Sequence, residues 1–343
     1  MTLGLGLSLA VAGTACKKDD KKADTATGDK AADKGDKAAD KGGDKPGAMP
    51  KATGDDLSLI PLDSELVLGL NFAQLQSSAL WKQFVEPMML SNADMVKDMG
   101  EFKAKCGFDP LLAIKSISVG LKNIDSGKPE GVAIVHGLEK GKIATCLDAM
   151  KDQMAAKGSE VTRDGDVILV KNTKENKTVG MTFTNDTTLL VAIADPVTAD
   201  TVKKAAATQS TLKTSPPFLD MYSKVKTGDS LWALMNGNSK AFDKMGQMGA
   251  KPKALFGSLN VTDGLAVDMR MRFEKADDAT QVATAVKQQI GSLSKFADKA
   301  EANADGSDVH IEIGMSNQKL QSLIQQFGPM LSAFGGGGMK PAQ

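Results

Sequence analysis

Two histidines are the only imidazoles in this 343-residue chain, which makes them the first candidates for catalysis or metal binding. His136 lies in the segment IVHGL and His310 in DVHIE, both of which we expect to be strands. Neither has a second ligand at zinc-site spacing, and the motifs G-x-S-x-G and G-x-x-x-x-G-K-[ST] are missing from the chain. The acidic pair Asp164/Asp166 fits a hairpin turn better than a cation site. We therefore predict no catalytic residue, no cofactor and no metal site, and we expect the protein not to be an enzyme.

Cys106 and Cys146 are the two cysteines in the body of the chain. If the protein is exported, an even pair of cysteines favours a disulfide. Two buried thiols are the first alternative, and redox chemistry is the second, although the chain has no C-x-x-C pair. A bridge would join the helix that ends at Cys106 to the helix that carries Cys146.

Methionine is unusually abundant, with 18 residues in a chain that is only 4% aromatic. Many of these methionines are adjacent or fall at same-face spacings: Met88/Met89, Met95/Met99, Met150/Met154, Met245/Met248 and Met269/Met271. We interpret them as flexible core filling. The alternative is an apolar groove for a lipid, a peptide or copper(I).

An uncharged apolar run occupies the N-terminus and ends at Cys16. It is too short to span a bilayer as a helix, but it has the length of a signal-peptide core. The residues Ala12-Gly13-Thr14-Ala15-Cys16 resemble the lipobox of bacterial lipoproteins, although Gly13 stands where that family usually has Leu. The resemblance implies that residues 1–15 are a cleaved signal peptide and that Cys16 is lipidated, with palmitate among its acyl chains. An ordinary signal peptide with Cys16 as a bystander is the alternative.

No Lys or Arg precedes the apolar run, so we expect the natural chain to begin a few residues upstream. Residues 16–56 are expected to be a disordered tether, because they are rich in Lys, Asp, Ala and Gly and repeat GDKAADK at 28–34 and 35–41. Residues 335–343 form a Gly-rich tail that we also expect to be disordered. The 42 basic and 42 acidic residues balance, which argues against a nucleic-acid partner.

The remaining chain predicts an α+β fold with antiparallel sheets and helices packed on one face. Strands are expected at 65–71, 117–122, 131–137, 167–171, 178–184 and 188–194, and helices at 72–105, 140–157 and 197–207. A similar order follows from residue 230, with a hairpin at 255–273, a helix at 277–296, a strand at 309–314 and a final helix at 317–327. We interpret residues 57–208 and 209–334 as two diverged copies of a strand–helix–hairpin–helix–strand unit. The pattern leaves open whether the copies form one sheet or two lobes.

The turn Cys106–Pro110, the hairpin after it and the helix bearing Cys146 also resemble a loose group of uncharacterised bacterial lipoproteins. That resemblance implies a disulfide and an anchored domain, and it implies no activity. We expect a lipoprotein of the cell envelope, held at the outer membrane or periplasmic face by acyl chains on Cys16. Its domain would bind a protein partner or act as a scaffold. A carrier or chaperone for an apolar ligand is the second hypothesis, and a hydrolase without a recognisable motif is the third.

Overall fold

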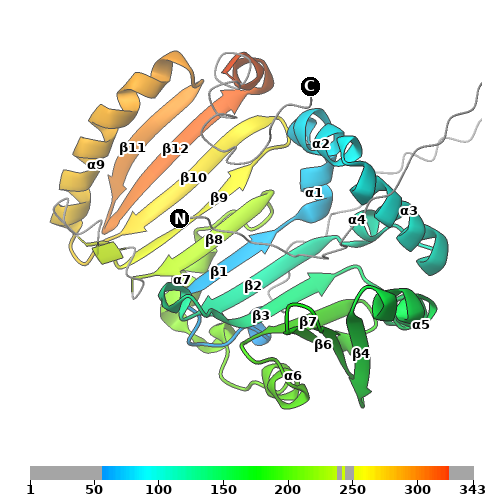
Figure 1. The fold of residues 1–343 in the computed structure, drawn as a ribbon. Coiled ribbons are helices and arrows are strands. Elements are labelled where there is room, and N and C mark those ends of the chain that lie inside the picture. The colour runs from blue at the N-terminus through cyan, green and yellow to red at the C-terminus, as the bar shows by residue number, and fades with distance from the viewer. Residues whose placement is uncertain (1–55, 238–241, 244–250, 324–343) are drawn as a thin grey trace, which may run out of the picture. The chain divides into compact units, whose positions relative to one another are not determined.

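The computed structural model describes residues 56–237, 242–243 and 251–323, and these residues build one continuous antiparallel sheet (Figure 1). Its twelve strands lie in the order β11-β12-β10-β9-β8-β1-β2-β3-β7-β6-β5-β4. The strands are β1 Leu66–Leu70, β2 Ser116–Lys122, β3 Glu130–His136, β4 Ser159–Asp164, β5 Val167–Asn172, β6 Lys177–Asn185, β7 Thr188–Ile193, β8 Leu231–Asn236, β9 Ala254–Asn260, β10 Gly264–Arg272, β11 Lys299–Asp305 and β12 Asp308–Ser316. The antiparallel α+β fold is confirmed, and the question of one sheet or two lobes is answered as one sheet.

Helices connect the strands. They are α1 Phe72–Ser77, the π-helical turn η2 Trp81–Val85, α2 Glu86–Ser91, α3 Ala93–Cys106, α4 Pro110–Ala113, α5 Lys140–Ala156, α6 Ala199–Ala206, α7 Pro216–Ser223 and α9 Ala276–Ile290. Short 3₁₀ turns are η1 Asp56–Ser58, η3 Ile124–Ser126, η4 Leu212–Thr214 and η5 Gly291–Lys295. Residues 317–323 are helical as well, as expected.

The two halves of the chain meet at β1 and β8, which pair in the centre of the sheet with Leu68 opposite Ala233. From this pair the first half runs outward as β2, β3, β7 and β6, and the second as β9, β10, β12 and β11. By sheet position β12 therefore corresponds to β7, and not to the strand at 167–171 with which the sequence pattern aligned it. The matching order of these strands in the two halves is compatible with two diverged copies. The duplication itself stays a prediction.

Local signals explain where the elements begin and end. Asn71, Asn92, Asp109 and Ser215 each accept a hydrogen bond from a backbone N–H in the first turn of the helix that follows. The helical stretch expected at 72–105, with a break at Pro87, is divided into four pieces. Pro87 lies in the first turn of α2, and the cap that starts α3 is Asn92. The strands β4 and β11 were not predicted, since their sequences SEVTRD and KAEANAD are mostly polar.

One face of the sheet, which we call the closed face, is packed against η1, η4, α6 and α7. Its core joins Val67 and Trp232 of the central strands to Phe218 and Met221 of α7. The indole of Trp232 lies directly across from Gly69, where a Cβ atom would collide with the ring. Because Gly69 has no side chain, it leaves room for the buried indole of Trp232.

Helices cover parts of the other face too. The buried residues Ala279 and Ala283 of α9 pack on Val309 and Ile311 of β12. At the far edge, Arg163 of β4 donates hydrogen bonds to Asp148 and to the carbonyl of Ala144, both in α5. The helices are therefore distributed over both faces, where the sequence pattern predicted one. The reason is that the central strands are apolar on both sides, as in the run LVLGL of β1.

The linker boundary also differs from the expectation. Asp56, which the sequence pattern assigned to the tether, is 3% exposed and belongs to η1. Within the described ranges, no helix has both the length and the apolar character needed to cross a bilayer.

Candidate functional site

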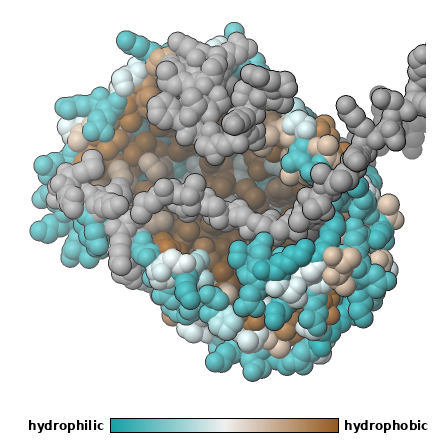
Figure 2. Space-filling model, in the orientation of Figure 1, coloured by the Kyte–Doolittle hydropathy of each residue, from teal (hydrophilic) through white to brown (hydrophobic). Residues whose placement is uncertain are grey.

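An apolar surface lies on the central strands between α9 and α5, and we call it the open face. On β3, β2, β1, β8 and β9 the side chains of this face form three rows across the sheet. The outer rows are Val135–Ile117–Leu70–Leu231–Leu259 and Gly131–Leu121–Leu66–Met235–Leu255, and the middle row is Ala133–Val119–Leu68–Ala233–Gly257. Figure 2 shows hydrophobic surface in a hollow on the side of the molecule that faces the viewer. Every row consists of apolar residues and glycine.

The open face is incompletely buried. Leu66, Leu68 and Leu70 of β1 are all half-buried, whereas Val67 between them is 2% exposed on the closed face. None of these three leucines belongs to a buried core cluster of the described residues. A sheet face of this kind is an unusual feature, because large apolar surfaces are normally covered or used for binding.

The middle row makes this surface uneven. It carries Ala133, Ala233 and Gly257 at three of its five positions, while the flanking rows are mostly Leu, Ile, Val and Met. We call this row, in which Val119 and Leu68 stand between the small residues, the trough. Five strands at a spacing of about 4.8 Å give this trough a length of about 19 Å.

The backbone under the open face has no hydrogen-bonding capacity to offer. Each of the five strands is paired with a neighbour on both sides, so its N–H and C=O groups are used within the sheet. An extended peptide lying on this face would leave its own amides without hydrogen-bond partners. Each unpaired amide would weaken binding by about 1–3 kcal/mol. A hydrocarbon chain has no such groups. The open face therefore suits an acyl chain better than an extended peptide.

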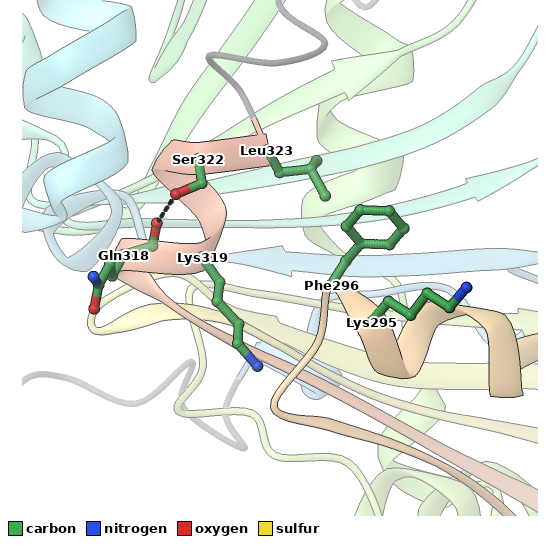
Figure 3. Close-up of a pocket in the computed structure, with 6 residues that line it drawn as sticks. All are labelled: Lys295, Phe296, Gln318, Lys319, Ser322 and Leu323. Atoms are coloured by element: carbon green, nitrogen blue, oxygen red, sulfur yellow. Dashed lines mark hydrogen bonds between the residues drawn. The ribbon is translucent and has the colours of Figure 1, made fainter.

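A small pocket of about 340 Å³ lies between η5 and the helix at 317–323 (Figure 3). Phe296 and Leu323 point toward each other in it. Lys319 also lines it, but its amino group already binds Asp298 at 2.7 Å and the carbonyl of Ala297 at 3.1 Å. With this lysine already engaged, we assign no ligand to the pocket.

The predicted disulfide between Cys106 and Cys146 is present, with the two Cα atoms 4.4 Å apart. It joins the last residue of α3 to the middle of α5, as expected from the two helices. The predicted lipidation site, Cys16, lies outside the described residues.

His136 is part of a buried polar network that the sequence did not reveal. Its Nε2 lies 2.8 Å from Asp56 and its Nδ1 lies 3.1 Å from the hydroxyl of Thr188. Ser118 donates a hydrogen bond of 2.6 Å to the other oxygen of Asp56. The order carboxylate–imidazole–hydroxyl is that of a hydrolase triad. However, Thr188 is only 5% exposed, so a substrate could not reach its hydroxyl, and we interpret the network as a clamp that holds η1 against β3.

His310 lies on the closed-face side of β12, within reach of two carboxylates. Its Nε2 is 2.8 Å from Asp268, and together with Glu312 these groups are close enough to hold a metal ion. Both carboxylates already bind a lysine: Asp268 pairs with Lys226 at 2.6 Å and Glu312 with Lys299 at 2.8 Å. A cation would have to displace both ammonium groups.

The ring orientation of His310 argues against metal binding as well. Arg270 approaches its Nδ1 at 3.4 Å, and an arginine can only donate. The imidazole proton therefore belongs on Nε2, which faces Asp268 and is the atom a metal would need free. Burial by itself raises the pKa of Asp268, but hydrogen bonds from Lys226 and His310 lower it below its ordinary value overall. We interpret the cluster as an ion-pair network.

The methionines do not form one surface. Met271 is 7% exposed and packs in the core under α9, whereas Met88 is 61% exposed on α2. Met150 lies beside the disulfide, with its sulfur 3.5 Å from that of Cys106. Core filling therefore describes some of them, whereas Met235 lies in an outer row of the open face. Met245 and Met248 lie outside the described residues.

The residues of the trough are those that sequence analysis missed. Their signal is a short apolar run with a small residue at its centre, as in LWALM of β8. Comparison with known proteins adds no assignment: no protein-family model, curated protein or solved structure matches the chain.

Proposed function

We propose that this protein is an exported lipoprotein, anchored through Cys16, whose domain binds an apolar ligand on the open face. The ligand class is a lipid acyl chain. The observation that carries the proposal is the set of apolar rows on β1, β2 and β8, which are half-buried except at Val119 and which no described core cluster includes.

Size supports this ligand class. A trough of about 19 Å compares with about 15 Å for the hydrocarbon of one bilayer leaflet, half of the whole core. Binding would be driven by removal of apolar surface from water on both partners. No catalytic group is needed, and the buried hydroxyl of Thr188 lies on the opposite face of the sheet.

The test is binding of palmitate to the delipidated full chain, measured by titration calorimetry. Ala233→Phe adds a ring in the middle of the trough and is expected to weaken binding by about tenfold or more, equal to about 1.4 kcal/mol. Ala266→Phe is the matched control, because Ala266 is an exposed strand residue on the closed-face side of β10. It should leave the affinity unchanged.

Two results would contradict the proposal. One is the lack of any heat of binding or added mass with palmitate in the wild-type chain. The other is an equal loss of affinity in both variants, which would place the ligand away from the trough.

A further inference from the structure

The segment from η2 to the start of α3 is almost entirely exposed, although it is rich in apolar residues. None of the helical elements α1, η2, α2, α3 and α4 contains a buried residue. We call the part from Trp81 to Lys97 the arm. Figure 1 draws α2 and α3 at one end of the strands, to the side of the sheet.

The arm carries five large apolar side chains in contact with solvent. Their exposed fractions are Phe84 41%, Met88 61%, Leu90 64%, Met95 40% and Val96 43%. The described residues have eleven exposed large hydrophobic side chains in all, and five of them lie within residues 84–96. Isolated exposed hydrophobic residues are ordinary, but a concentration of this kind marks an interaction surface.

The remainder of α3, which follows the arm, is held on α5 and on Lys157 at its end. The disulfide joins Cys106 to α5, and Lys157 forms an ion pair of 3.3 Å with Asp98. Lys105 also donates a hydrogen bond of 2.6 Å to Gln153. The arm is therefore braced through α3 on α5 and presents its apolar residues without needing them for the core.

We infer that the arm inserts into the surface of the lipid bilayer to which the protein is anchored. This inference rests on the anchor at Cys16 in the proposed function, and it adds the surface through which an acyl chain could enter from the membrane. Exposed Phe, Met, Leu and Val are the side chains that partition into the headgroup–acyl boundary. Lys82 and Lys97 flank the apolar residues, and their long stems allow the charge to remain in water.

We favour a bilayer over other partners of the arm because the proposed lipid anchor at Cys16 keeps the domain close to a membrane. A polar linker of 40 residues has a root-mean-square span on the order of 35 Å and a maximum length of about 140 Å. The arm is thereby kept at high effective concentration near lipid, so even a weak insertion suffices. The acidic Glu86 and Asp94 balance the two lysines, so insertion should depend little on salt and should occur in neutral membranes.

Trp81 provides a direct probe. It is partly exposed at the start of the arm, and the second of the two tryptophans, Trp232, is 2% exposed inside the sheet. The acylated full chain is placed in phosphatidylcholine vesicles with brominated or ordinary acyl chains, and tryptophan emission is compared. We expect bromolipid to reduce the Trp81 emission by about twofold, and Trp81→Phe to remove this effect.

The variant Met88→Asp/Leu90→Asp should abolish the quenching. Val179→Asp/Leu219→Asp is the matched control, because these residues are also exposed, at 46% and 38%, but lie on β6 and α7. Circular dichroism checks that both variants fold. Equal quenching in the arm variant and the control would overturn the inference, as would the lack of quenching in an acylated, vesicle-bound chain.

Other outcomes are also decisive. If the chain proves to be unacylated, the anchor fails, and a titration of the free chain with excess vesicles then tests the arm by itself; no quenching at any lipid concentration refutes it. If sedimentation shows a dimer that the arm variant dissociates, the partner is a second copy and the inference is wrong. Palmitate binding without vesicles reports separately on the open face.

Discussion

Gly69 shows how one residue decides the packing of the sheet centre. The indole of Trp232 packs directly on the backbone of β1 at Gly69, and a side chain there would collide with the ring. Gly69→Ala is expected to lower the free energy of unfolding by about 1–3 kcal/mol, because the added methyl overpacks a rigid core. Gly100→Ala is the control: a Cβ there meets no neighbouring atom in α3, and the change should stabilise by about 0.5–1 kcal/mol. Urea denaturation of both variants measures the opposite signs, and equal effects would refute the packing argument.

Asp308 is the buried carboxylate with the largest set of partners. Arg272 donates to both of its oxygens, at 2.7 and 2.9 Å, and Lys224 lies 2.8 Å away. Burial by itself raises the pKa of Asp308, but these hydrogen bonds outweigh it and lower the pKa below the ordinary value of 3.8. Protonation therefore occurs less readily in the folded chain than in the unfolded one.

The direction of the pH dependence follows. Because the folded pKa is the lower one, Asp308 contributes stability above about pH 4, and this contribution is lost as the pH falls through 3.8 toward the folded value. Asp308→Asn is expected to lower the free energy of unfolding at pH 7 by about 3 kcal/mol and to flatten its decline below pH 4. Asp305→Asn removes an exposed partner of Arg270 and should cost at most about 1 kcal/mol. The prediction is wrong if the free energy of unfolding of Asp308→Asn declines below pH 4 as steeply as that of the wild type.

At the scale of elements, the helix α3 is tied to the body of the domain by a covalent link. None of the helices α1 to α4 contains a buried residue, and α3 contacts the body of the domain through α5. Cys106→Ser/Cys146→Ser is expected to destabilise by about 4 kcal/mol in the chain-entropy model. The loss should appear first as faster amide exchange in α3, while β8 in the sheet centre stays protected. Equal loss of protection in β8 would show that the bridge supports the whole fold.

At the scale of the whole molecule, the anchor is the feature that remains a prediction. If Cys16 is acylated, Cys16→Ser should move the protein from the membrane fraction to the soluble fraction without changing the melting temperature of the domain. The mass of the purified chain then shows whether it begins at Cys16 and carries acyl groups. Membrane association of an unacylated Cys16→Ser chain would refute the anchor as the main attachment, and the arm would then be the first candidate.

Much of the fold was accessible from local patterns. The hairpin at β2–β3, the meander β5–β7 and the helices α5 and α9 were predicted, because turn residues and hydrophobic periodicity are local signals. The disulfide followed from there being two cysteines in the body of the chain. The polar strands β4 and β11 were missed, because they are edge strands that present few apolar residues.

By itself, then, the sequence determined the fold class, most of the elements and the one disulfide, all of which depend on residues that are neighbours in the chain or few in number. Only the tertiary structure decided that β1 pairs with β8, that Asp56 meets His136, and that the apolar rows of five strands align as the open face. The physical reason is that strand pairing joins segments far apart in the chain. Their register follows from which faces can be buried together, and that is a property of the assembled sheet.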